Sequence, residues 1–326
     1  MYVALDREIT DILCCPLCKG RLDLRDREFV CQDCATSYPR RRVAQGEAKE
    51  EVLDFRIDRP SYCVPGGLDR WSGVQKEYEA YHRRQRSRDN LKRYLDEIDS
   101  VQEIYTEEFR IEGRVLDVGG HQGRLRHFLS EDDVPLYISV DPYLEVFQNI
   151  VFQPNLFKAY PCLSKPCNFL ACHAENLPFV ARTFDWVHMR SVLDHFQDPY
   201  LALKEAYRVL KAGGSLLIGL TVRGGKSPLR TDNGLSVGSR SFPPIFRIAA
   251  RIRREGFKGL TRGVLARVRR TGTSAEYQKT VDDHMFRWNY EDLVNLLDIT
   301  SFEIVKEHWQ KLPFTMCVYM SAVKPQ

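Results

Sequence analysis

Short apolar segments alternate with segments of helical spacing from residue 113 to residue 222. The apolar segments read RVLDV, LYISVD, NFLAC, FDWVHM and SLLIGLTV, and stretches such as DPYLALKEAYRVLKAG lie between them. Each apolar segment has the length of a buried strand, and each intervening stretch places its apolar residues on one helical face. The alternation predicts an α/β fold with a doubly wound, mostly parallel sheet.

Three features follow the ends of these strands, where ligands bind in such sheets. The first is the glycine-rich loop DVGGHQG at residues 117–123, which runs toward a predicted helix. The second is Asp141, 24 residues after Asp117, and the third is HAENLPF at residues 173–179. Glycines allow a ligand to approach the backbone, and an acidic side chain at a strand end accepts hydrogen bonds from ribose hydroxyls.

The loop does not contain the GxGxxG pattern of dinucleotide sites, and the chain shows no other pattern that cradles a pyrophosphate. NAD and FAD therefore fit less well than S-adenosylmethionine, a nucleoside cofactor without phosphate. Asp117 beside the loop suits the ammonium group of that cofactor.

The ordered run VLDVGGHQGRL, YISVD, HAENLPF, TFDWV, LDHFQDP and EAYRVLKAGG resembles the class I S-adenosylmethionine-dependent methyltransferases. It is most similar to the branch of quinone-ring C-methyltransferases and small-molecule methylating enzymes, over residues 110–222. The resemblance implies a Rossmann-like sheet with an antiparallel terminal strand. It also implies in-line methyl transfer to a small-molecule or lipid-like acceptor.

Carried over position by position, the resemblance implies a set of cofactor-binding residues. The glycine loop would line the methionine end, Asp141 would hold the ribose, Ala174 and Glu175 would contact the adenine, and Met189 would lie near the sulfonium. The full set is Asp117, Gly119, Gly120, His121, Gly123, Asp141, Ala174, Glu175 and Met189.

Two histidines depart from the family pattern. His121 replaces the middle glycine of the loop, and His173 stands where the family has an aspartate near the adenine. If only glycine holds the backbone angle at residue 121, His121 strains or closes the loop. Histidine is, however, enriched in left-handed conformations, so a binding-competent loop is the favoured interpretation. A direct catalytic role of His121 is a third interpretation.

Asp194 and His195 follow the strand FDWVHM and are expected at the mouth of the site. As a pair they could deprotonate a phenol, a hydroxyl or an activated carbon during methyl transfer. The competing interpretation is structural, with His195 capping or orienting the next helix. Both interpretations stay open from the sequence.

Four cysteines near the N-terminus form two CxxC pairs, Cys15 with Cys18 and Cys31 with Cys34, separated by twelve residues. Two such pairs supply four thiolates for a tetrahedral, structural Zn²⁺ in a small ribbon. This stretch also resembles the small zinc-ribbon protein that activates several methyltransferases of tRNA and translation factors. The resemblance covers about the first 40 to 55 residues. After Tyr38 the sequence PRRRVAQGEAKEEV departs from the usual apolar ending of that family.

Composition and charge limit the remaining interpretations. The chain of 326 residues has 43% hydrophobic and 28% charged residues, and it has no apolar run as long as a membrane span. The N-terminus lacks a signal-peptide pattern, so we expect a cytoplasmic protein whose cysteines are thiols or metal ligands.

The predicted organisation is a zinc ribbon at 1–55, a linker with approach helices at 56–110, and a methyltransferase domain at 111–326. A basic amphipathic insert occupies about 223–280. From Arg223 to Arg270 it carries 13 Lys and Arg against 2 Asp and Glu, or +11, while the whole chain carries +4. Such an insert suits a structural lid, peripheral contact with the inner membrane surface or a lipid-like substrate, or RNA. Two alternatives to small-molecule methylation follow, an RNA methyltransferase and a non-catalytic zinc-ribbon binding protein.

Overall fold

The computed structural model describes residues 7–26, 28–45, 48–57, 67–85, 89–144, 153–226, 284–312 and 316–326. The basic insert expected at 223–280 therefore lies outside the described residues, except for its first four positions. Among the helices that the structure describes, none is long and apolar enough to cross a membrane.

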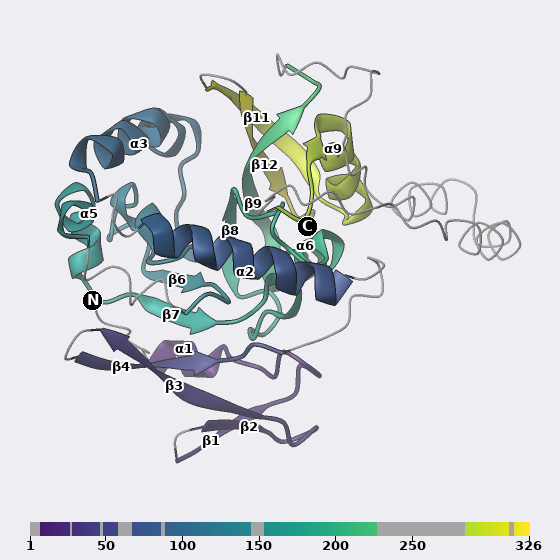
Figure 1. Cartoon of the computed structure of the whole chain (residues 1–326). Coiled ribbons are helices and arrows are strands. Elements are labelled where there is room, and N and C mark those ends of the chain that lie inside the picture. The colour runs from purple at the N-terminus through teal and green to yellow at the C-terminus, as the bar shows by residue number, and fades with distance from the viewer. Residues whose placement is uncertain are drawn as a thin grey trace, which may run out of the picture.

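Five parallel strands form the centre of the molecule and confirm the predicted sheet (Figure 1). Their order is β7-β6-β5-β8-β9, so the chain first winds outward from β5 on one side and then on the other. Their bounds are Arg114–Val118 for β5, Leu136–Val140 for β6, Asn168–Ala171 for β7, Phe184–Arg190 for β8 and Leu210–Arg223 for β9.

The C-terminal part closes this sheet as expected. After the short β10 (Trp288–Asn289), α9 (Tyr290–Ile299) leads into β11 (Glu303–Lys311) and β12 (Met316–Val323). β12 pairs antiparallel with β9 along Ser215–Thr221, and β11 pairs antiparallel with β12.

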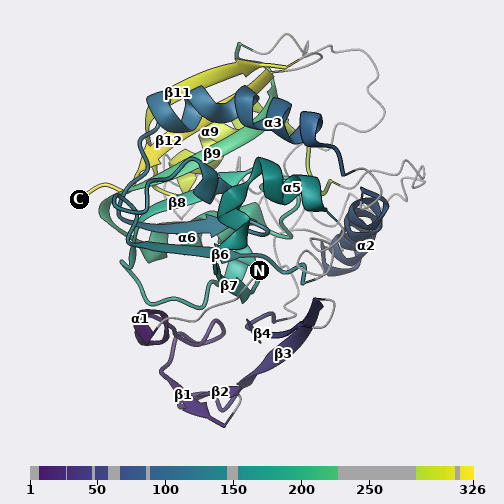
Figure 2. The same cartoon turned by 90° about the vertical axis from the view of Figure 1, so that its left-hand side faces the viewer.

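Helices cover the sheet where the sequence places apolar stripes. α6 (Pro199–Val209) begins at Asp198, whose carboxylate accepts from the backbone N–H of Leu201, and it buries Leu203 and Ala206 in the core. α3 (Leu91–Glu103) continues into a π-helical turn, η2 (Ile104–Glu108), and it packs beside α5 (Pro154–Ala159) (Figure 2).

The helix expected after the glycine loop is much shorter than predicted. Only η3, a single 3₁₀ turn at Arg124–His127, follows Gly123. Two more short turns, η4 (Pro161–Ser164) and η5 (Ala174–Asn176), flank β7. One 3₁₀ turn has little aligned dipole, so the site depends on loop backbone and side chains more than on a helix N-terminus.

The N-terminal ribbon continues into the central sheet. It consists of α1 (Arg7–Asp11), β1 (Leu22–Arg25), β2 (Glu28–Cys31), β3 (Ser37–Gln45) and β4 (Ala48–Asp54). β4 pairs in parallel with β7, joining Leu53 to Leu170 and Asp54 to Ala171. The β3–β4 hairpin, which lies within the predicted ribbon at 1–55, therefore extends the edge of the central sheet.

The ribbon and the central sheet also share one hydrophobic core. Ile9, Phe29 and Phe55 from the N-terminal part belong to the same buried cluster as Leu177 and Phe179 after β7. Leu13 forms an antiparallel bridge with Phe179, and the Cys14 N–H donates to the Pro178 carbonyl at 2.9 Å. The N-terminal part thus directly supports the segment that follows β7.

α2 (Gly67–Gln85) crosses the molecule near the carboxyl ends of the parallel strands (Figures 1 and 2). The sequence predicts an amphipathic helix here but not its location. Its described side chains Trp71, Gln75 and Tyr78 lie over the strand ends and enclose the candidate site.

Candidate functional site

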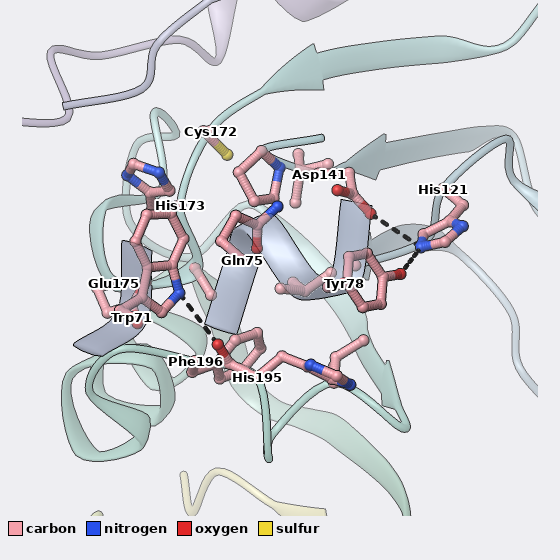
Figure 3. A pocket seen from close by; sticks show the side chains of 16 residues that line it. Trp71, Gln75, Tyr78, His121, Asp141, Cys172, His173, Glu175, His195 and Phe196 are labelled. Atoms are coloured by element: carbon pink, nitrogen blue, oxygen red, sulfur yellow. Dashed lines mark hydrogen bonds and ion pairs between the residues drawn. The ribbon is translucent and has the colours of Figure 1, made fainter. Parts of the chain in front are cut away.

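A cavity of about 540 Å³ lies where the strand ends meet α2 (Figure 3). It brings together most of the residues assigned by resemblance to ribose and adenine. Strand ends and loops contribute Val118, Gly119, His121, Val140, Asp141, Pro142, Cys172, His173, Ala174, Glu175, Val192, His195 and Phe196, and α2 contributes Trp71, Gln75 and Tyr78.

His121 occupies the glycine position of the loop in a left-handed conformation, with φ of +49°. This position thus requires the conformation that glycine adopts most easily, and histidine tolerates it better than most residues. The Tyr78 hydroxyl from α2 is hydrogen-bonded to Nε2 of His121, and the same nitrogen lies 3.7 Å from Oδ2 of Asp141 (Figure 3). The His121 side chain therefore joins the loop to α2.

The two glycines before His121 are required by close contacts. A Cβ atom on Gly119, where φ is +72°, would lie 2.4 Å from Cγ1 of Val192. One on Gly120 would lie 2.4 Å from Oδ2 of Asp117. Any side chain there would displace a strand-end residue, so the loop backbone keeps its close approach to the site.

Burial shifts the ionisation of several groups in this cavity. Burial raises the pKa of Asp141 to about 7, although backbone N–H groups of Tyr143 and His121 favour its charged form. Burial also raises the pKa of Glu175 to about 7, against a hydrogen bond from the Asp198 N–H at 2.9 Å. Burial and the nearby Arg124 guanidinium lower the pKa of His121 to about 3, so the imidazole is neutral at neutral pH.

Asp117 lies at the centre of a buried hydrogen-bonded chain. Its Oδ1 is 2.7 Å from Nδ1 of His188, and its Oδ2 accepts from the Tyr137 hydroxyl. Nε2 of His188 is in turn 2.9 Å from the Tyr105 hydroxyl. These partners fix the Asp117 carboxylate at the floor of the neighbouring cavity, where it can face an ammonium group.

A second, larger cavity of about 1230 Å³ lies on the other side of the loop. It shares Tyr78, Gly119, His121, Val192 and His195 with the first. Aromatic and charged side chains form most of the remaining lining, which comprises Tyr81, Glu97, Tyr105, Asp117, Gly120, Arg124, Leu125, Phe128, Tyr160, His188, Arg190, Ser191 and His284.

The predicted pair Asp194 and His195 lies at the boundary between the two cavities. His195 lines both, and its Nε2 is 3.9 Å from Oδ1 of Asp194. A third residue, His284, reaches Oδ2 of Asp194 at 3.3 Å from a distant part of the chain. The carbonyl of Asp194 accepts from the N–H groups of Met285 and Phe286, which fixes that segment beside the loop after β8.

Two of the residues assigned to the cofactor line neither cavity. Met189 lies in β8 between His188 and Arg190, which line the larger cavity, and it is fully buried in the core. Because side chains alternate across a strand, Met189 points to the opposite face, and its assignment near the sulfonium is wrong. Gly123, with φ of +79°, shapes the loop through its N–H bond to the Gly120 carbonyl at 2.8 Å without lining either cavity.

The four ribbon cysteines come together as the spacing predicts. Their sulfur atoms all lie within 4.8 Å of one another, with 3.7 Å between Cys15 and Cys34 and 3.4 Å between Cys18 and Cys31. Tetrahedral Zn²⁺ with Zn–S bonds of ~2.3 Å would place its sulfurs ~3.8 Å apart. The Tyr38 hydroxyl lies 3.0 Å from the Cys15 sulfur and can donate to a thiolate. The cluster fits a closed, structural zinc site.

One ion pair joins the zinc ribbon to α6 and to the segment that follows η5. Nζ of Lys19, next to Cys18, lies 2.6 Å from Oε2 of Glu205 on α6. The same oxygen accepts from the N–H of Leu177, which follows η5. The contact therefore connects the first CxxC turn of the ribbon, Cys15–Cys18, with the loop that carries Glu175.

Sequence reasoning missed several residues of the site. Trp71, Gln75 and Tyr78 lie in a region expected only as approach helices, and His284 was not among the assigned site residues. His188 had a recognisable signal, because it is a polar residue in an otherwise buried strand. The α2 residues had none, since their helix periodicity is that of any packed helix.

Comparison with known protein families gives two matches along the chain. Residues 116–218 match the methyltransferase domain family, and residues 6–39 match the Trm112p-like protein family. The ubiquinone/menaquinone biosynthesis C-methyltransferase of Haemophilus ducreyi is 47% identical over 51 residues, which are 16% of this chain and 20% of that protein. The match therefore spans only about a fifth of that relative's length.

The N-terminal part matches whole small proteins. A UPF0434 protein of Dechloromonas aromatica is 44% identical over 56 residues, which cover 15% of this chain and 97% of that protein. Among solved structures, a Burkholderia thailandensis 1,6-didemethyltoxoflavin-N1-methyltransferase aligns with a TM-score of 0.46 and 14% identity. That alignment covers 92% of this chain and 100% of that one.

Proposed function

We propose that the chain is an S-adenosylmethionine-dependent methyltransferase, because residues 116–218 match the methyltransferase domain family and residues 6–39 match the Trm112p-like family. Its acceptor is a small, ring-containing or lipid-like molecule. The observation that carries the proposal is the meeting of two cavities at one glycine-rich loop. One cavity has the features of a nucleoside site, and the other is larger and aromatic.

The smaller cavity offers side chains of the kind that recognise an adenosine. Asp141 offers a carboxylate at the end of β6, where ribose hydroxyls can donate to it. Trp71 from α2 and Ala174 from η5 supply apolar surface for a purine ring, and Glu175 lies beside them. Asp117, held by His188, offers a negative charge to the methionine ammonium on the far side of the loop.

When bound, S-adenosylmethionine supplies an activated methyl group on a sulfonium. The task of the chain is then to align the acceptor with that methyl and to exclude water, since positioning supplies much of the rate of such a displacement. Tyr105, Phe128 and Tyr160 give the larger cavity ring surfaces against which a planar acceptor can pack. His195, at the boundary with Asp194 beside it, is placed to take up a proton from the acceptor.

The relatives support a ring-containing acceptor. Relatives that match the methyltransferase part include C-methyltransferases of ubiquinone and menaquinone biosynthesis. The RNA alternative rests on the zinc ribbon together with the basic insert, and membrane contact rests on the insert. Beyond residue 226 the insert lies outside the described residues. We therefore favour the small-molecule acceptor.

Calorimetric titration of the zinc-containing protein with S-adenosylmethionine tests the first half of the proposal. Binding in the micromolar range is expected, and its absence from protein with intact zinc would favour the non-catalytic zinc-ribbon alternative. The second half is tested by formation of S-adenosylhomocysteine with hydroquinones and phenols as acceptors, compared with total tRNA and rRNA. Turnover with RNA alone would overturn the small-molecule assignment.

A further inference from the structure

A cluster of two imidazoles and one carboxylate lies at the boundary of the acceptor cavity. Asp194 and His195 come from the loop after β8, and His284 comes from the segment before β10, some 90 residues later in the chain. One ligand atom from each residue lies within 4.8 Å of the other two. His195 and His284 line the larger cavity, and their rings lie 4.7 Å apart at an angle of 33°.

Each carboxylate oxygen of Asp194 faces a different imidazole. Oδ2 lies 3.3 Å from Nε2 of His284, and Oδ1 lies 3.9 Å from Nε2 of His195. Oδ1 is buried and accepts no hydrogen bond from any residue that the structure describes. A buried anionic oxygen without a donor is costly, so this arrangement calls for a positive partner between the three side chains.

The distances fit ligands of one ion better than hydrogen bonds. A charge-assisted N–H···O bond spans ~2.7–2.9 Å. Two ligand atoms each ~2.1 Å from a zinc-like ion lie ~3.0–3.4 Å apart when cis or tetrahedral. The 3.3 Å between His284 and Asp194 falls in the second range. The 3.9 Å between His195 and Asp194 needs a shift of about half an ångström to reach it.

We propose that Asp194, His195 and His284 bind a divalent first-row transition-metal ion, separate from the zinc of the ribbon. Two imidazoles and one carboxylate suit borderline ions such as Zn²⁺, Fe²⁺ or Co²⁺ and leave coordination positions open toward the cavity. The side chains of Asp194, His195 and His284 are 16%, 20% and 39% exposed, so an ion and a further ligand can reach them.

The role of the ion rests on the proposed methyl transfer. An acceptor hydroxyl that binds the ion loses its O–H proton to water and keeps the electron pair on oxygen. That oxygen, or a ring carbon conjugated with it, then forms a bond to the methyl carbon as the methyl–sulfur bond breaks. His195 acts here as a metal ligand, and its proton-accepting role passes to water.

Metal content tests the proposal without any activity measurement. Untagged protein is equilibrated with Zn²⁺, freed of excess ion and analysed by mass spectrometry. The wild type is expected to hold about two equivalents per chain, one in each site. His284→Ala and Asp194→Asn should each hold about one equivalent. The matched control is His308→Ala, because His308 forms a comparable pair with Glu108 at 3.5 Å on β11. It should keep both equivalents.

Co²⁺ added to protein with zinc in the ribbon should give visible d–d absorption without thiolate charge-transfer bands, and His284→Ala should abolish it. A single equivalent in the wild type that disappears in Cys18→Ser would overturn the proposal. Calorimetry with S-adenosylmethionine on the same samples reports folding and separates the two hypotheses. Intact cofactor binding with one metal equivalent refutes only the second metal site, whereas two equivalents without cofactor binding refute only methyl transfer.

Discussion

Replacing Asp141 with asparagine is expected to stabilise the cofactor-free protein while weakening cofactor binding. The pKa of Asp141 is raised to about 7 by burial, from ~3.9 in an unfolded chain. The folded state therefore favours the protonated carboxyl. The resulting contribution to stability is fully present below pH ~4 and is lost as the pH rises to about 7. At ~1.4 kcal/mol per pKa unit, the loss reaches as much as ~4 kcal/mol.

Asparagine cannot ionise, so it avoids this loss. Its Oδ1 can still accept from the Tyr143 N–H, which donates to Asp141 at 2.8 Å. The backbone N–H of His121 also favours the carboxylate form of Asp141. In the variant this donor faces the side-chain amide NH₂, which is itself a donor, and the lost hydrogen bond costs ~1 kcal/mol or somewhat more. The net gain at pH 8 is ~1–3 kcal/mol of unfolding free energy, which urea denaturation without cofactor measures.

The effect on cofactor affinity has the opposite sign. A charged acceptor for ribose hydroxyls contributes ~1.5–3 kcal/mol, so Asp141→Asn should raise the Kd for S-adenosylmethionine ~10- to 100-fold. In the wild type the affinity should fall as the pH drops below about 7, because the carboxylate becomes protonated. Asp96→Asn is the control and should leave the Kd unchanged, since Asp96 is an exposed carboxylate on α3 that pairs with Lys92 at 2.7 Å and lines neither cavity. An unchanged Kd of Asp141→Asn, or its lower stability at pH 8, would refute the reasoning.

Three further outcomes are expected. Gly120→Ala should abolish cofactor binding measured by calorimetry, because its Cβ would lie 2.4 Å from the Asp117 carboxylate. The control is Gly73→Ala on α2, where a Cβ has no atom within 4 Å. It should leave binding intact and raise the unfolding free energy by ~0.5–1 kcal/mol. Glu205→Gln should lower the thermal midpoint by several degrees. It removes the carboxylate that pairs with Lys19 of the ribbon at 2.6 Å, which costs ~1–3 kcal/mol of unfolding free energy. An unchanged midpoint would show that this contact contributes little. Removing zinc with a chelator, or by Cys18→Ser, should lower the thermal midpoint of the whole chain, measured by circular dichroism. The ribbon and the central sheet are coupled because β4 pairs with β7. An unaffected main transition would show that the ribbon unfolds independently.

Local sequence patterns were enough to predict the central strands and the zinc ribbon. Buried strands need continuous apolar runs and helices need a period near 3.6, so each strand from β5 to β9 was recognisable in isolation. The ribbon was equally predictable, because two CxxC turns supply four thiolates, the ligand set of a tetrahedral Zn²⁺ ion. The glycine loop and Asp141 line one cavity because all parallel strands end at one edge of the sheet, and their assignment to the cofactor stays a prediction.

The conformation of the glycine-rich loop at residues 117–123 could not be predicted from local sequence alone. Whether His121 disrupts the glycine turn depended on its partner, and that partner is Tyr78 on a helix 43 residues earlier. The error at Met189 has a similar origin. A strand's sequence gives the alternation of its side chains, but the sheet's packing decides which set faces the cavity.

Short-range periodicity and cysteine spacing were enough to predict the secondary-structure elements and the four-cysteine cluster. Long-range contacts were needed to show that the ribbon extends the central sheet, that α2 encloses the first cavity, and that His284 meets Asp194 and His195. These contacts join segments far apart in the chain. They form where folded elements bury their apolar faces together, and no local pattern in the chain encodes which elements meet.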